Sequence, residues 1–209
     1  MAQVANKPGF GVFTPQGWRM DLAEIKDPVE QYNAMSRVAQ EAERLGFDGV
    51  WLYDHLHTTP QPTLNTTFEC WISTAALARD TQRIRIGQMV SCNGYRNPAY
   101  LAKVASTVDV LSNGRLDFGL GAGWYEHEWR AYGYGFPDAP TRLKMLGEAL
   151  PMLASKFRHG GRRNRDNESW CRHKKSLFTG KAEEAWNSRS RGGRSGQGDC
   201  PFSRTPIPP

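Results

Sequence analysis

An alternation of short apolar runs with longer amphipathic segments restricts the fold of this chain more than any other feature of its sequence. The apolar runs predict buried strands over residues 10–14, 49–55, 83–91 and 115–120. Helix-like segments separate these runs, and strands that are joined by helical crossovers must run parallel. The first 153 residues therefore predict about four βα units.

Helix start signals stand between the predicted strands. Asp27 and Asn97 are each followed by proline, an arrangement typical of helix starts. Thr66 and Glu69 have the spacing of a capping box, which predicts a helix that Thr66 caps. A fourth helix is predicted from four leucines at helical spacing: Leu143, Leu146, Leu150 and Leu153.

Two architectures accommodate four parallel βα units. One is an open, doubly wound α/β sheet, and the other is half of an eight-stranded (β/α)8 barrel of the TIM type. A complete barrel needs about 250 residues, so this chain of 209 residues carries too few units for one. The periodicity alone leaves both architectures open.

Residues 154–209 do not continue the pattern. Leu177 and Ile207 are their only Leu, Ile or Val residues, and Gly- and Arg-rich runs replace the expected helix and strand. Such a composition cannot bury enough apolar surface to offset the entropy cost of ordering, so we expect a disordered tail. The abrupt change is also what a shifted reading frame or an early stop would produce, leaving a truncated chain; reading the gene in its other frames tests this hypothesis.

The net charge of +6 originates in the same last quarter of the chain. Residues 154–209 hold 13 of the 27 Lys and Arg residues but only five of the 21 Asp and Glu residues, so residues 1–153 are slightly acidic. Arginine with glycine binds nucleic acid when stacking aromatics are interleaved, but Trp170, Phe178 and Trp186 are sparse and follow no repeat. We interpret the basic charge as incidental and expect no nucleic-acid partner.

Cysteine spacing and hydropathy exclude further classes. The four cysteines form no CxxC pair, which argues against a zinc site, and we expect no metal. No apolar run approaches the ~20 residues of a membrane helix. The N-terminus lacks the layout of a signal peptide, so a cytoplasmic protein without a membrane partner is expected.

A glycine-rich turn, GLGAGW at residues 119–124, follows the fourth predicted strand. It lacks the GxGxxG fingerprint of dinucleotide binding, because the third glycine would fall at Trp124 when counted from Gly119, and at Glu126 when counted from Gly121. Two interpretations remain. The glycines let a strand end turn tightly, or they let a flat cofactor lie close to the backbone at the catalytic face of a barrel.

Asp54 and His55 close the second predicted strand. Because strand carboxyl ends face the active site in α/β barrels, His55 is a candidate catalytic residue, with a structural histidine as the alternative. Asp54 is a neighbouring carboxylate that can set the charge and tautomer of the imidazole. His57 lies in a Pro/Thr-rich loop and is expected to face solvent.

Five segments in this order resemble the luciferase-like flavin-dependent oxidoreductases, and among them the deazaflavin-dependent branch: FGVFTPQ, GVWLYDH, RIRIGQMVSCNGYRNP, LSNGRLDFGLGAGWYEHEW and AYGYGFP. The resemblance covers about residues 9–153. It implies the N-terminal half of a (β/α)8 barrel, with an FMN or deazaflavin ring across the carboxyl ends of the strands. Members of this family continue for four more βα units, to which nothing in residues 154–209 corresponds.

The resemblance also implies roles for single residues. His55 matches a histidine that lies near the reactive ring as an acid/base or orienting group, and Asp54 precedes it as a second candidate catalytic residue. Residues 90–92 match a bulge with a non-prolyl cis peptide behind the ring. The implied cofactor-binding positions are those of the bulge, the glycine-rich strand end and the residues after it: Val90, Ser91, Cys92, Gly119, Gly121, Gly123, Trp124 and Glu128.

Two functions follow from this resemblance. The first is an oxidoreductase or monooxygenase that moves a hydride or activates oxygen through FMN or a deazaflavin coenzyme, with a small-molecule substrate. The second is a non-catalytic half-barrel that persists by pairing with a copy of itself, as a homo-oligomer, or with another half-barrel. The absence of later strands motivates the second function, because it leaves the first and fourth strands as unpaired edges.

Overall fold

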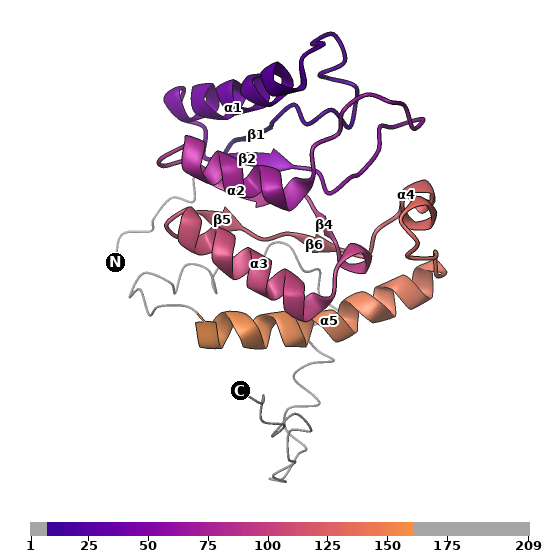
Figure 1. The fold of residues 1–209 in the computed structure, drawn as a ribbon. Helices are drawn as coiled ribbons and strands as arrows, with labels where there is room; N and C mark the ends of the chain where they lie inside the picture. Colours follow the sequence, from indigo (N-terminus) through magenta and orange to yellow (C-terminus); the bar gives the residue numbers. More distant parts are fainter. Residues whose placement is uncertain (1–7, 161–209) are drawn as a thin grey trace, which may run out of the picture. The chain divides into compact units, whose positions relative to one another are not determined.

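A computed structural model describes residues 8–160 of the chain, with side chains up to residue 155. One sheet has the strand order β1-β2-β3-β5 with every pair parallel (Figure 1). These strands are β1 (Gly11–Phe13), β2 (Gly49–Leu52), β3 (Arg85–Gln88) and β5 (Leu116–Asp117). Farther along the same chain segments, β4 (Ser91–Cys92) and β6 (Leu120–Gly121) form a second parallel pair. The predicted parallel α/β fold is confirmed.

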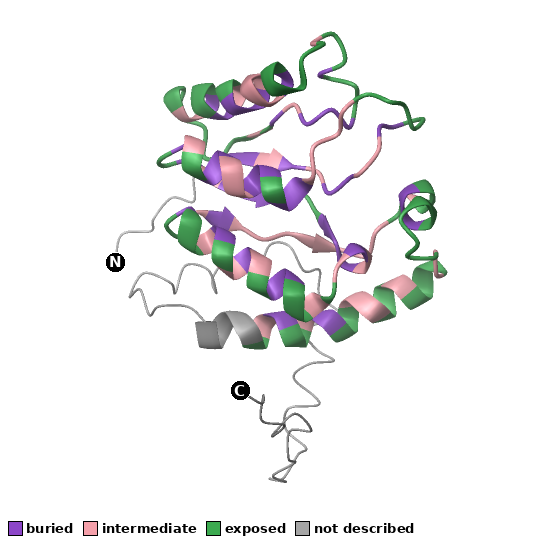
Figure 2. Cartoon of the chain, viewed as in Figure 1, coloured by how far each residue is buried: buried purple, intermediate pink, exposed green. Residues whose placement is uncertain are grey.

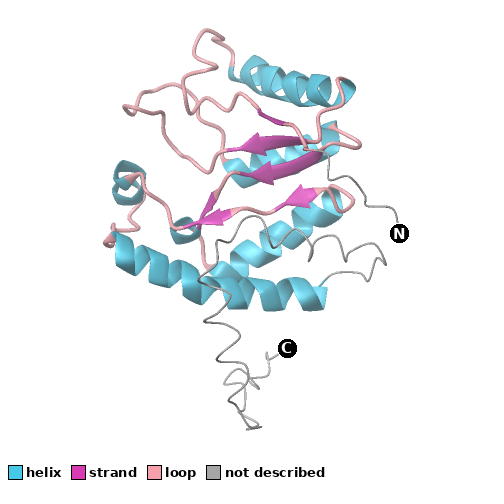
Figure 3. Ribbon diagram, turned by 180° about the vertical axis from the view of Figure 1, so that it is seen from behind, coloured by secondary structure: helices cyan, strands magenta, loops and turns pink. Residues whose placement is uncertain are grey.

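The longer helices connect and cover these strands. They are α1 (Pro28–Arg44), α2 (Cys70–Asp80), α3 (Pro98–Leu111) and α5 (Ala139–Gly160). Figure 3, a view from behind, shows the strands in front of the helices. Buried residues gather on the strands and on the helix sides that face them (Figure 2). Two short helices follow the carboxyl ends of strands: η1 (Asn93–Tyr95) after β4 and α4 (Glu126–Ala131) after β6.

Two of the three predicted helix caps are confirmed. The carboxylate of Asp27 accepts a hydrogen bond from the Val29 amide, and Asn97 caps α3. The prediction that Thr66 caps the second helix is wrong, because α2 begins at Cys70 and Glu69 caps it. The main chain at Phe68 is paired with Gln16, whose carbonyl accepts from the Phe68 amide and whose side chain donates to the Phe68 carbonyl. This pairing keeps the chain out of the helix until Glu69.

The register of the paired strands places their side chains in rows, which alternate between the two faces of the sheet. Paired residues form the rows Val12–Val50–Ile86–Leu116 and Phe13–Trp51–Gly87–Asp117. The first row packs against the helices in the main core. The second row lies on the opposite face, which no helix among residues 8–160 covers (Figure 3). In a closed barrel this second face is the interior.

The Trp51 indole occupies much of this second face. A Cβ atom at Gly11 would lie 2.3 Å from Trp51 Nε1, and one at Gly87 would lie 2.6 Å from the Trp51 ring. Glycine at both positions is therefore needed for the indole to lie flat along the strands. A single large side chain fills the width of three strands.

The last described helix extends beyond the predicted domain boundary. Helix α5 continues past Leu153 to Gly160. Leu153 is buried against the core, whereas Leu143 is 61% exposed, so only the later part of the predicted leucine face packs. The tail expected to be disordered lies, from residue 161 on, outside the described residues. None of the helices within residues 8–160 has the length and apolar character that crossing a membrane requires.

Candidate active site

Segments that follow four strands meet at the carboxyl edge of the sheet. The Gln16 side chain, after β1, bonds to both backbone groups of Tyr53 after β2. The amide of Cys92 donates to Asp54, and the amide of Ser91 donates to the carbonyl of Gly119. The parallel topology thus brings residues distant in sequence into one cluster, as the sequence predicted for strand carboxyl ends.

His55 is nearly buried in this cluster and is held on several sides. Its imidazole lies flat on the indole of Trp18, with ring centroids 4.2 Å apart and planes 2° from parallel. The rings of Trp124 and Tyr125 approach it edge-on at 5.7 and 6.0 Å. His55 Nδ1 lies 2.9 Å from an oxygen of Glu128. Among the described residues, none forms a hydrogen bond with His55 Nε2.

Glu128 anchors the segment that carries His55. Its side chain has no exposed surface. One carboxylate oxygen accepts from the amides of Leu56 at 2.6 Å and His57 at 2.8 Å, and the other accepts from the Tyr95 hydroxyl at 2.7 Å. Burial raises the pKa of Glu128, but the hydrogen bonds, with that from His55 foremost, lower the pKa below its ordinary value overall. Glu128 is therefore a buried carboxylate whose partners lie within the chain, and its predicted place among the cofactor-binding residues stays a prediction.

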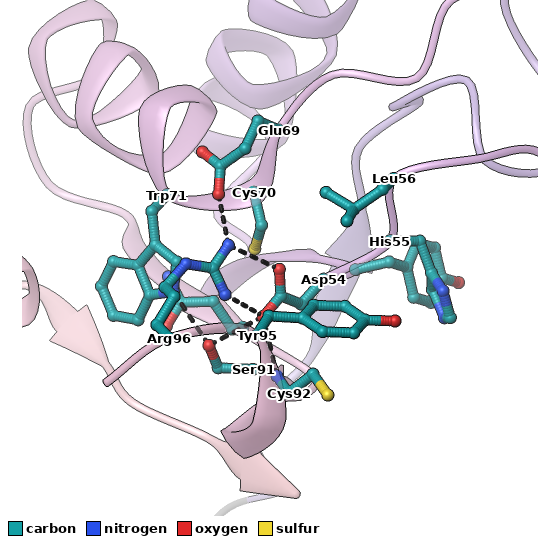
Figure 4. Close-up of polar contacts among 12 residues, drawn as sticks. Asp54, His55, Leu56, Glu69, Cys70, Trp71, Ser91, Cys92, Tyr95 and Arg96 are labelled. Atoms are coloured by element: carbon teal, nitrogen blue, oxygen red, sulfur yellow. Dashed lines mark hydrogen bonds and ion pairs between the residues drawn. The ribbon is translucent and has the colours of Figure 1, made fainter. Parts of the chain in front are cut away.

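Asp54 was expected to contact the His55 imidazole, but it pairs with Arg96 instead. Its carboxylate accepts hydrogen bonds from both terminal nitrogens of the Arg96 guanidinium at 2.6 and 2.9 Å. It also accepts from the Cys92 amide at 2.7 Å and from the Ser91 hydroxyl at 3.0 Å. Arg96 also contacts Glu69. Figure 4 shows the Asp54 carboxylate turned toward Arg96 and away from the His55 ring. The carboxylate that contacts the imidazole is Glu128, so the expectation that Asp54 sets its tautomer is wrong.

The predicted bulge lies between β3 and β4. The Met89–Val90 peptide is cis, and both side chains are 45% exposed. Ser91 and Cys92 point inward instead: Ser91 accepts from the Trp71 indole at 2.8 Å, and burial raises the pKa of the Cys92 thiol to about 12. Of the three predicted residues, only Val90 offers side-chain surface to a ligand.

The glycine-rich strand end makes room for this bulge. A Cβ atom would lie 2.3 Å from the Gln88 carbonyl oxygen at Gly119 and 2.6 Å from the Val90 side chain at Gly121. At Gly123, where φ is +80°, it would lie 2.5 Å from the Cys92 sulfur. Packing of the neighbouring strand thus explains all three glycines. Their small size is needed by the chain itself, and the interpretation that it also lets a flat cofactor lie close to the backbone stays a prediction.

Several residues that build this edge were missing from the sequence prediction. Trp18, Tyr95 and Arg96 each come within a few residues of a strand end, so the position argument that selected His55 also applied to them. His57, predicted to face solvent, is only partly exposed, because its Nδ1 is buried and its ring lies beside those of His127 and Tyr132. Trp124 is 60% exposed beside His55, as a residue walling a ligand site would be.

Residues 9–167 match the family model of the luciferase-like monooxygenases. The chain belongs to this family. The F420-dependent glucose-6-phosphate dehydrogenase of Amycolatopsis mediterranei is 31% identical over 61% of this chain and 39% of its own length. The oxygenase component of the flavin-dependent trigonelline monooxygenase of Acinetobacter baylyi is 29% identical over 66% of this chain and 37% of its own length.

Solved structures agree on the fold. An F420-dependent secondary alcohol dehydrogenase, in complex with an F420-acetone adduct, superposes with a TM-score of 0.57 at 25% identity, over 71% of this chain and 41% of its own. The oxygenating constituent of 3,6-diketocamphane monooxygenase from Pseudomonas putida, in complex with FMN, gives 0.56 at 22% identity, over 69% of this chain and 38% of its own. The predicted family and TIM-barrel fold class are confirmed, and the chain spans about two-fifths of the length of these relatives.

Proposed function

We propose that this chain carries the part of an oxidoreductase active site that contacts the ring of FMN or of a deazaflavin coenzyme. The observation that carries the proposal is His55, whose Nδ1 is engaged by Glu128 while its Nε2 has no partner among the described residues. A nearly buried imidazole with one free nitrogen is suited to taking or giving a proton. It lies at the strand edge where (β/α) barrels hold their active sites.

The side chains around His55 fit a flat, largely apolar ring. Met89 and Val90 are each 45% exposed and Trp124 is 60% exposed, so apolar surface is available at this edge. When bound, a flavin or deazaflavin supplies the redox chemistry, while the protein positions, shields and tunes. The names and titles of the relatives mention both kinds of coenzyme, F420 and flavin. They support a coenzyme of the flavin or deazaflavin type for this chain, and experiment must decide between the two.

A small hydroxyl-bearing molecule is the proposed substrate class. Two of the relatives are F420-dependent dehydrogenases, one of glucose-6-phosphate and one of secondary alcohols. Interconversion of a hydroxyl and a carbonyl group moves a proton at oxygen as well as a hydride at carbon. His55 is placed to exchange that proton through Nε2. The cytoplasmic location expected from the sequence remains a prediction.

Titration of the chain with FMN and with coenzyme F420, followed by fluorescence, tests the proposal. A glutamate at Val90 adds a charge to the proposed ring surface, so Val90→Glu should abolish binding of the coenzyme that the unaltered chain binds. Val110→Glu is the matched control, because Val110 is 79% exposed on α3 and lies away from the strand edge. Binding of neither coenzyme, or equal loss in both variants, would refute the proposal.

A second candidate function is pairing between two copies of the chain. The sheet has four parallel strands with β1 and β5 at its edges, and its second face is uncovered within the described residues. Two such sheets contain the eight strands that a closed barrel needs. Phe13→Glu on this face should dissociate a dimer, whereas Phe47→Glu, of similar exposure (37% against 38%), should not. A monomer in size-exclusion chromatography of the unaltered chain would exclude this candidate.

A further inference from the structure

Glu128 differs from Asp54, the other buried carboxylate at the strand edge, in the kind of its partners: Asp54 pairs with the Arg96 guanidinium, whereas Glu128 contacts the His55 imidazole. Each of its two oxygens has two hydrogen-bond partners; the Leu56 and His57 amides can only donate, and the Tyr95 hydroxyl donates in this arrangement. The fourth partner is His55 Nδ1, which can donate or accept according to tautomer. An ionised carboxylate accepts at every position, and this is the state that its lowered pKa favours.

We propose that Glu128 is the positioning residue that fixes His55 as the Nδ1–H tautomer and thereby leaves the lone pair of neutral imidazole on Nε2. With Glu128 ionised, Nδ1 must carry the hydrogen for the 2.9 Å contact to be a hydrogen bond. Free histidine prefers the opposite tautomer, so the protein has to impose this one. This inference rests on the proposed function in one respect, because it is the proposed reaction that supplies the proton for Nε2 to exchange.

Stacking on Trp18 completes the restraint. Because the two rings are 4.2 Å apart and 2° from parallel, the imidazole keeps its plane. Within that plane, a 180° flip would place the Cδ2 carbon against the Glu128 oxygen and lose the hydrogen bond. Trp18 therefore sets the plane of the ring and Glu128 sets which nitrogen points inward, so Nε2 is directed away from the buried carboxylate.

Removing the negative charge of Glu128 should reverse the tautomer. In Glu128→Gln, the amide oxygen can still accept from the Leu56 and His57 amides, which places the amide nitrogen toward His55 and Tyr95. That nitrogen donates, so Nδ1 becomes an acceptor and the hydrogen moves to Nε2. Tyr95→Phe is the matched control, because it removes one of the four contacts and leaves the carboxylate facing Nδ1.

Long-range 1H–15N NMR of the full chain, labelled in its five histidines, measures this directly at a pH where the imidazoles are neutral. His55→Gln assigns the His55 signals, and exposed His127 serves as an internal reference. The expected result is a protonated Nδ1 and an unprotonated Nε2 in the unaltered chain and in Tyr95→Phe, with the two exchanged in Glu128→Gln. A predominant Nε2–H tautomer in the unaltered chain overturns the inference, even if Glu128→Gln fails to fold. Lack of coenzyme binding leaves this spectrum unchanged and counts only against the proposed function.

Discussion

The indole of Trp18 lies flat on the imidazole of His55, with 4.2 Å between their ring centroids. The two residues come from segments that follow neighbouring parallel strands, β1 and β2, so the stack exists only once those strands have paired. Trp18 is 8% exposed, and its indole N–H is buried without a hydrogen-bond partner among the described residues. The indole therefore contributes through its ring surface and not through its polar group.

Substitution of Trp18 should separate these two contributions. Trp18→Ala removes the stacked surface and leaves a cavity, so the free energy of unfolding should fall by about 3–5 kcal/mol. Trp18→Phe keeps an aromatic ring and removes the unpartnered N–H, so its cost should stay below about 1.5 kcal/mol. Urea unfolding measures both, and equal costs would show that stacking on His55 is unimportant for stability.

Loss of Arg96 should be among the most damaging single changes at the strand edge. Its side chain is 13% exposed, and it neutralises the fully buried Asp54 as well as Glu69. Burial lowers the pKa of Arg96, but its two carboxylate partners raise the pKa above the ordinary value. Arg96→Met leaves a buried charge unpaired and should cost about 3–5 kcal/mol in urea unfolding.

Arg130→Met is the matched control for this change. Arg130 pairs with Glu126 one helical turn away, with both side chains more than half exposed, and such pairs contribute about 0.3–0.5 kcal/mol. If the Arg96 and Arg130 variants lost similar stability, the role assigned to the buried network would be wrong.

Acid should destabilise the fold in part through Glu128. Its pKa in the folded chain is lowered below the ordinary 4.5, so its stabilising contribution is present in full above that pH and is lost as the pH falls through the folded value. The free energy of unfolding should therefore decrease below about pH 4.5, and the difference between the unaltered chain and Glu128→Gln should shrink over that window. The exposed Glu126→Gln should show no such convergence; a constant gap for Glu128→Gln would contradict the lowered pKa.

Two glycines should respond in opposite directions to alanine. At Gly119 a Cβ atom would lie 2.3 Å from a backbone oxygen, so Gly119→Ala must displace the neighbouring strand and should cost about 1–3 kcal/mol. At Gly147, inside α5, nothing lies within 4 Å, and alanine should stabilise the helix by about 0.5–1 kcal/mol. Thermal unfolding measures both signs, and a stabilised Gly119→Ala would show that the packing against Gln88 is wrong.

Periodicity and cap signals predicted the parallel α/β order, because strands and helices are specified by local patterns of apolar residues. The Asp27 and Asn97 caps are read from adjacent residues and were predicted correctly. The start of α2 was missed, because the pairing of Phe68 with Gln16 is a contact across 52 positions of sequence. The same limit applies at the site: position after a strand selected His55, but which carboxylate faces it depends on the fold. Asp54 is its neighbour in sequence, whereas Glu128 is its neighbour in space.

A flavin or deazaflavin ring is proposed to bind at the carboxyl edge of the sheet, beside His55. Backbone NMR of the 15N-labelled chain, titrated with FMN or with coenzyme F420, tests this binding site. We expect saturable shifts that centre on His55, Val90 and Trp124, with α1 and the amino ends of the strands unaffected. Saturation with shifts centred elsewhere, or no shifts with either coenzyme, would contradict this proposal.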